Sequence, residues 1–166
     1  MKTLPPAICI VGLSGAGKTI LLEGLIQEMS GRGYRLATVK HSHHTLAPDT
    51  PAKDSFRHAE AGAEAVALAS PGHLALFRRR QGDWPLAEVL ALLAGFDLVL
   101  VEGYKGARAP KIEVCRGRPA LPLEELAAAV SDEPLDLPIP CFSPDALGAI
   151  GDFIEGLLGL KPRRSP

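Results

Sequence analysis

The sequence predicts an α/β fold in which a mostly parallel sheet is covered by helices on both faces. Segments with the pattern of strands alternate with segments that have the pattern of helices. Several strands are apolar throughout, as in sheets that are buried on both sides. In addition, residues 12–19 (GLSGAGKT) match the phosphate-binding pattern G-x-x-x-x-G-K-[ST] at every fixed position. We therefore expect a P-loop NTPase.

The segments on either side of this motif have the character that a P-loop requires. Residues 7–11 (AICIV) are apolar and partly β-branched, which predicts a buried strand. Residues 19–29 repeat apolar side chains at helical spacing, which predicts a helix packed on the sheet. The alternative is a glycine-rich turn that carries Lys-Thr by chance, and the flanking strand and helix argue against it.

Each residue type in the motif suits phosphate binding. Glycines allow backbone conformations that are closed to other residues, so several N–H groups can point at one anion beside the positive end of a helix. Lys18 would neutralise the β- and γ-phosphates, and the Thr19 hydroxyl would bind Mg²⁺. The predicted nucleotide contacts in the motif are Gly12, Ser14, Gly15, Ala16, Gly17, Lys18 and Thr19.

The next segments predict a strand, a loop and a short helix. Residues 36–39 (LATV) form an apolar strand, and residues 42–53 are polar with two prolines, which predicts a loop. Residues 54–61 predict a helix, because short polar side chains at its start can cap free N–H groups and Gly62 can end it.

Two strand-like segments and a helix follow. Residues 65–69 and 74–77 are separated by the turn signal Ser-Pro-Gly-His, so they form either a hairpin or two neighbouring strands. Residues 85–93 predict a helix with proline in its first turn.

The rest of the chain continues the alternation. Residues 96–103 hold the most hydrophobic strand, which ends in a carboxylate, and residues 111–115 alternate, which predicts a strand with a more exposed face. A brief helix is expected at 124–128, and residues 128–130 lead to a strand end late in the chain. Residues 144–158 predict a terminal helix.

Length and composition restrict the function. Residues 1–160 are long enough for one nucleotide-binding domain, and residues 161–166 are expected to form a disordered tail. The net charge of −1 argues against nucleic-acid binding, and no apolar run reaches the ~20 residues that span a bilayer. The cysteines are scattered and no signal peptide precedes the first strand, so we expect a cytoplasmic protein with reduced thiols.

Ligands of parallel sheets bind at the carboxyl ends of the strands. This rule brings segments that are far apart in the sequence to one edge of the sheet. Besides the P-loop, they are Lys40 with His41, Glu102 with Gly103, and Ser131 with Asp132.

Glu102 is the best candidate for the acid that holds magnesium, because P-loop enzymes use an acid at the end of a neighbouring strand. Gly103 would let the backbone approach the γ-phosphate. The alternative for Glu102 is a solvated strand end. Asp54 is a further candidate ligand, and its alternative is a plain helix cap. The candidate catalytic residues are thus Lys18, Thr19 and Glu102, and the candidate metal ligands are Thr19, Glu102 and Asp54.

The cluster of His41, His43 and His44 has two interpretations. In an extended segment His41 and His43 share a face and could chelate a metal, but a metal site needs three or four ligands with supporting bonds. Contact with an anion or substrate is the better interpretation, since Lys40, the histidines and Arg57 form a cationic rim near the phosphates.

Taken together, these segments resemble the molybdopterin-guanine dinucleotide biosynthesis adaptor protein B family. The resemblance extends from Ile8 to Ile154. Its histidine-rich and Val-Glu-Gly-Tyr-Lys segments are more specific than the P-loop alone. The matching segments, in chain order, are residues 12–19, 39–44, 53–63, 101–105, 110–112 and 131–132.

The resemblance implies a P-loop protein that binds GTP with Mg²⁺, hydrolyses GTP weakly and forms a homodimer across its nucleotide sites. It also implies a partner, the guanylyltransferase that joins GMP to molybdopterin, so the protein would assist maturation of the molybdenum cofactor. Molybdopterin is a second candidate ligand. The candidate contacts to substrate or partner are Lys40, His41, His43, Arg57 and Lys105.

Recognition of the guanine base lacks its familiar signature, because the pattern Asn-Lys-x-Asp is absent. Asp132 is the candidate replacement. Its carboxylate would accept hydrogen bonds from the N1–H and the amino group of guanine, a pair that adenine does not offer. The alternative is an ordinary turn before Pro134.

The reaction that these residues predict is attack of water on the γ-phosphate of GTP. No residue is identified that positions the water and no arginine finger is evident, so slow turnover is expected. Three alternatives remain. They are an ATP-dependent ligase or kinase that resembles dethiobiotin synthetase, a metallochaperone GTPase, which the missing Cys-His ligand set argues against, and a pure binding adaptor.

Overall fold

Two compact units make up the computed structural model, which describes residues 3–42, 44 and 53–161. One unit comprises Met1–His41 with Pro85–Pro166, and the other comprises Ser42–Trp84. The expectation that residues 1–160 form one domain stays a prediction. The expected tail at 161–166 lies, apart from Lys161, outside the described residues.

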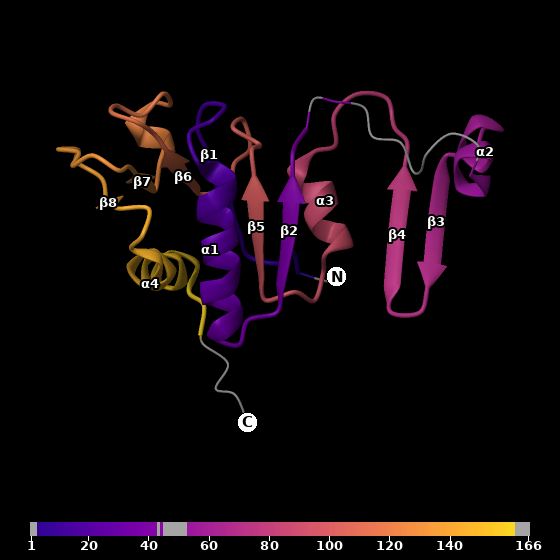
Figure 1. Ribbon diagram of the computed structural model, residues 1–166, viewed down its shortest axis with the longest axis horizontal. Coiled ribbons are helices and arrows are strands. Elements are labelled where there is room, and N and C mark those ends of the chain that lie inside the picture. The colour runs from indigo at the N-terminus through magenta and orange to yellow at the C-terminus, as the bar shows by residue number, and fades with distance from the viewer. Residues whose placement is uncertain (1–2, 43, 45–52, 162–166) are drawn as a thin grey trace. The chain divides into compact units, whose positions relative to one another are not determined.

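The first unit is built on a six-stranded parallel sheet. Its strands are β1 (Ala7–Val11), β2 (Leu36–Lys40), β5 (Leu98–Glu102), β6 (Lys111–Val114), β7 (Ala128–Val130) and β8 (Cys141–Phe142). They lie in the order β2-β5-β1-β6-β7-β8, and each neighbouring pair is parallel (Figure 1). The predicted mostly parallel sheet is confirmed, and β1, which leads into the P-loop, lies between β5 and β6.

Helices cover both faces of this sheet, as the sequence predicts. On one face, α1 (Lys18–Gly31) and α4 (Leu147–Leu158) bury Leu25 and Ile150 in one core with Ile8 of β1. On the other face, α3 (Leu86–Leu92) buries Leu90 in a second core with Cys9. Alternate residues of β1 thus serve two cores. Within the described residues, no helix combines the length and apolar character that a bilayer crossing requires.

Strand β6 differs from the expectation of a strand with a more exposed face. All four of its residues are buried, and Glu113 is only 1% exposed. The expectation was wrong because β7 and β8 extend the sheet beyond β6, so β6 is an interior strand. Lys111 and Glu113 lie on the same face of the sheet as Cys9. Leu123 and Leu126, from the segment before β7, pack in the core on that face.

Three smaller elements also differ from the sequence-based expectation. The brief helix expected at 124–128 is a 3₁₀ turn, η1 (Leu123–Glu125), and β7 follows at Ala128. The terminal helix starts at Leu147 rather than at residue 144. Strand β8 has only two residues, which is too short to produce a periodic sequence pattern.

The second unit is a two-stranded antiparallel sheet with a short helix. Strands β3 (Ala65–Ser70) and β4 (His73–Arg78) pair as a hairpin, which confirms one of the two arrangements predicted for them. Helix α2 (Asp54–Glu60) lies against β3. Residues 45–52 of the predicted loop lie outside the described residues.

Candidate nucleotide-binding site

The P-loop lies tightly against β6. Gly12 has a φ angle of +142°, and a Cβ atom on it would lie 2.2 Å from the carbonyl oxygen of Val114. Both the backbone conformation and the available space therefore exclude a side chain at Gly12. The first glycine of the motif is required by the fold itself.

Helix α1 begins at the end of the loop with an uncovered N-terminus. Gly17 is its N-cap in a left-handed conformation, no side chain in the described part of the protein caps it, and its first turn holds no acid. The free N–H groups and the helix dipole favour an anion at this position. Lys18 lies over the loop, where its Nζ donates a hydrogen bond to the carbonyl oxygen of Leu13 at 2.7 Å.

Thr19 and Glu102 are brought together at the edge of the sheet, although they lie 83 positions apart. The Thr19 hydroxyl donates to Oε2 of Glu102 at 3.5 Å. On the other carboxylate oxygen, Oε1, the Nζ of Lys40 lies 3.5 Å away. The side chain of Glu102 is 12% exposed and that of Lys40 is 67% exposed. A hydroxyl beside a mostly buried carboxylate supplies the oxygen ligands that Mg²⁺ takes, so these residues fit that metal.

His41 and Tyr104 stack beside this carboxylate. Their ring centroids are 4.3 Å apart, and the backbone N–H of His41 donates to the carbonyl oxygen of Glu102 at 2.9 Å. Gly103 has a φ angle of +96°, and a Cβ atom there would come within 3.0 Å of the Cβ of His41. Lys40, His41 and Gly103 thus lie together as predicted, while approach of Gly103 to a γ-phosphate stays a prediction.

The other predicted contact residues are not joined to this group by the structure. Asp54 and Arg57 belong to the second unit, where they form an exposed ion pair of 3.7 Å. Lys105 is exposed after β5, and His44 is also exposed, while His43 lies outside the described residues. Across residues 3–42, 44 and 53–161, no group of three or more His, Cys, Asp or Glu side chains is placed to hold a metal ion.

Asp132 lies at a pocket beside the end of β7. The pocket has a volume of about 340 Å³ and is also lined by Phe142 and Ser143, at the end of β8. The buried Ser131 hydroxyl accepts a hydrogen bond from the backbone N–H of Glu133 at 3.1 Å, which fixes the turn that carries Asp132. Ligand pockets commonly have volumes of ~300–1,000 Å³, so this pocket can take part of a small molecule.

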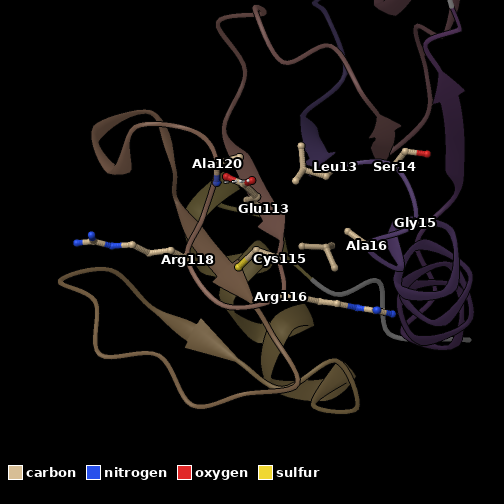
Figure 2. A pocket seen from close by; sticks show the side chains of 10 residues that line it. Leu13, Ser14, Gly15, Ala16, Glu113, Cys115, Arg116, Arg118 and Ala120 are labelled. Carbon is tan, nitrogen blue, oxygen red and sulfur yellow. Dashed lines mark hydrogen bonds between the residues drawn. The ribbon is translucent and has the colours of Figure 1, made fainter.

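A second pocket, which sequence reasoning missed, lies on the β6 side of the P-loop. It has a volume of about 170 Å³ and lies between residues 13–16 and the end of β6 with the loop that follows (Figure 2). Cys115 lines it, and burial raises the pKa of the Cys115 thiol, with a further contribution from the charge of Glu113. The pocket lies where the ends of β1 and β6 meet, with Val11 paired to Glu113, and a sequence does not reveal which residues of two distant strands pair.

Comparison with known proteins identifies the family. Residues 7–132 match the family of molybdopterin guanine dinucleotide synthesis protein B. The chain belongs to this family. It is 37% identical to the molybdopterin-guanine dinucleotide biosynthesis adapter protein of Haemophilus influenzae, with 95% of this chain and 92% of the relative aligned. It is 34% identical to the protein of the same name from Escherichia coli, with 92% and 93% aligned.

Solved structures of the family share the fold. The crystal structure of a MobB protein homolog from Bacillus stearothermophilus superposes with a TM-score of 0.69 at 31% identity, covering 90% of this chain and 98% of that one. The predicted family and the predicted fold class, an α/β fold of the P-loop NTPase type, are therefore confirmed.

Proposed function

We propose that this protein is an adapter in molybdopterin-guanine dinucleotide biosynthesis and that its P-loop binds GTP with Mg²⁺. Family membership supports the biosynthetic role, because the relatives from H. influenzae and E. coli are named as adapter proteins of this synthesis. The nucleotide part rests on one observation, the Thr19–Glu102 contact beside the uncapped N-terminus of α1. It combines a helix end that attracts phosphate with two oxygen ligands for the metal.

Different residues of the site bind different parts of the triphosphate. The N–H groups of the loop and of the first turn of α1 bind phosphate oxygens. Lys18 exchanges its contact with the carbonyl of Leu13 for contacts with the β- and γ-phosphates. Thr19 and Glu102 would hold Mg²⁺, which would neutralise charge on the phosphates.

Hydrolysis of GTP by this site is proposed to be weak. Lys18 and the loop N–H groups stabilise the charge that develops as water attacks the γ-phosphate. The sequence identifies neither a group that positions the water nor an arginine finger, so a partner is needed for fast turnover. The proposed partner is the guanylyltransferase that joins GMP to molybdopterin, with molybdopterin as a second ligand and a cytoplasmic homodimer as the acting form.

Asp132 is the proposed residue for recognition of guanine. It lines the larger pocket at the end of β7, and β7 is separated from β1 only by β6. At ~4.8 Å between neighbouring strands, this pocket is about 10 Å from the line of β1. That separation suits the base of a nucleotide whose phosphates lie in the P-loop.

Calorimetric titration with non-hydrolysable GTP and ATP analogues tests the proposal. The wild-type protein is expected to bind the GTP analogue more tightly, and Lys18→Ala is expected to weaken binding of both. Asp132→Ala should remove the preference for GTP, whereas Asp136→Ala, at an exposed acid outside the pocket, should keep it. A preference for ATP would contradict the proposal in favour of a small-molecule ligase or kinase, and binding of neither analogue would contradict the role of the P-loop.

A further inference from the structure

Arg116 lies on the side of the P-loop opposite Glu102. Strands β1 and β6 run in parallel register with Val11 opposite Glu113. Beyond the ends of these strands, Arg116 and Ser14 of the P-loop both line the 170 Å³ pocket. The β6 side therefore brings a guanidinium to the loop, whereas the β5 side brings a carboxylate.

The direction of its side chain distinguishes Arg116 from the neighbouring Arg118. In Figure 2, Arg116 extends past Ala16 toward α1, whereas Arg118 points the other way, out of the pocket. Arg116 is exposed, and it forms no ion pair or side-chain hydrogen bond with the described residues. Its charge is therefore free to bind an anion at the P-loop.

Glu113 fixes the loop that carries Arg116. The two carboxylate oxygens of Glu113 accept hydrogen bonds from the backbone N–H groups of Ala120, at 2.9 Å, and Leu121, at 3.0 Å. Burying a charged group costs free energy of desolvation, which such charge-assisted bonds offset. A buried carboxylate used in this way holds residues 115–121 in one conformation beside the P-loop.

The size of the pocket indicates which ligand Arg116 contacts. A volume of about 170 Å³ is below the ~300 Å³ at which pockets for separate small ligands begin. The pocket therefore does not hold a second ligand of its own. Arg116 instead faces the ligand of the P-loop, whose residues form one wall of the pocket.

We propose that Arg116 binds the phosphate chain of the nucleotide from the β6 side, and that Glu113 is its positioning residue. This inference rests on the proposed nucleotide binding. A guanidinium can donate two parallel hydrogen bonds to phosphate oxygens. Because Thr19 and Glu102, the proposed ligands of the metal, lie on the opposite side of the loop, the contribution of Arg116 to nucleotide binding does not depend on Mg²⁺.

Calorimetric titration of GDP and of a non-hydrolysable GTP analogue, each with Mg²⁺ and with EDTA, tests the role of Arg116. Arg116→Ala is expected to weaken binding of both nucleotides about ten-fold, by a similar factor in both buffers, while Arg118→Ala leaves binding unchanged. An unchanged affinity of Arg116→Ala, or a loss that appears only with Mg²⁺, would overturn the inference. If the wild-type protein bound neither nucleotide, the proposed function itself would fail. An unchanged affinity of Arg116→Ala in a protein that binds nucleotide would overturn only the role of Arg116.

A double-mutant cycle with GDP tests the positioning role of Glu113. Glu113→Gln is expected to weaken GDP binding in the wild-type background but to add no loss to Arg116→Ala, because it acts through the arginine. Independent, additive losses would overturn the positioning role. Thermal unfolding shows whether each variant is folded. If Glu113→Gln does not fold, Glu113→Asp, which keeps the charge on a shorter side chain, is used in its place.

Discussion

Glu102 and Glu113 lie on the two strands that flank β1, yet their surroundings differ in kind. The carboxylate of Glu102 contacts two side-chain groups, the Thr19 hydroxyl and the Lys40 ammonium, each at 3.5 Å. That of Glu113 accepts two backbone hydrogen bonds at 2.9 and 3.0 Å. Long contacts with side chains can be exchanged for contacts with a metal, whereas short bonds to the backbone cannot be exchanged unless the chain moves. The comparison assigns exchangeable contacts, of the kind a metal ligand needs, to Glu102 on the β5 side and a fixed structural role to Glu113 on the β6 side.

The largest expected effects on stability come from two glycine substitutions, one on each side of the P-loop. Gly12→Ala places a Cβ atom 2.2 Å from a backbone oxygen of β6, and Gly103→Ala places one 3.0 Å from the Cβ of His41. Backbone strain and overpacking together predict a loss of about 3 kcal/mol or more for Gly12→Ala and about 1–2 kcal/mol for Gly103→Ala. Urea unfolding measures both free energies. A larger loss for Gly103→Ala would contradict the tight contact with β6.

Removal of each glutamate gives the next largest effect. Glu113→Ala removes two charge-assisted hydrogen bonds to the backbone N–H groups of Ala120 and Leu121 and is expected to lower the free energy of unfolding by about 2–3 kcal/mol. Glu102→Ala is expected to cost less than about 1 kcal/mol, because its partner Lys40 is exposed and can be hydrated. Denaturant unfolding of both variants checks the order, and a reversed order would refute the assignment of roles.

The smallest expected effect is a difference in the rate at which the cysteine thiols are labelled, which tests the burial of the β6 side. Cys115 follows the buried strand β6, and burial raises the pKa of its thiol; burial also raises that of Cys9 to about 11, whereas Cys141 is exposed. A raised pKa keeps the reactive thiolate scarce at pH 8, and its fraction grows only as the pH rises toward the shifted value. Labelling at pH 8 should therefore modify Cys141 first in the folded protein and all three cysteines in urea. Equally fast labelling of Cys115 would show that the β6 side is open.

The contact between Thr19 and Glu102, on the β5 side, could be predicted from the sequence. The P-loop has fixed residues at fixed spacing, and Glu102 ends a strand that is apolar enough to be recognised. Because the carboxyl ends of parallel strands meet at one edge, the approach of Glu102 to Thr19 followed from the fold class alone. These features depend on local patterns and on one general rule of topology.

The β6 side could not be predicted in the same way. The alternation of Lys111, Ile112, Glu113 and Val114 is typical of a half-exposed strand, and the burial of this strand depends on β7 and β8. Those strands have three and two residues, which is too short for a recognisable pattern. The position of Arg116 depends on the register between β1 and β6, which is a property of the packed sheet.

Thr19 and Glu102 are proposed to form the magnesium side of a GTP site. Titration of a non-hydrolysable GTP analogue into wild-type protein and Glu102→Gln, with Mg²⁺ and with EDTA, tests it most directly. Mg²⁺ is expected to tighten binding to the wild-type protein by about ten-fold or more, because Thr19 and Glu102 would hold the metal and it would neutralise charge on the phosphates, and to have little effect on Glu102→Gln. The same dependence on Mg²⁺ in both proteins would contradict it.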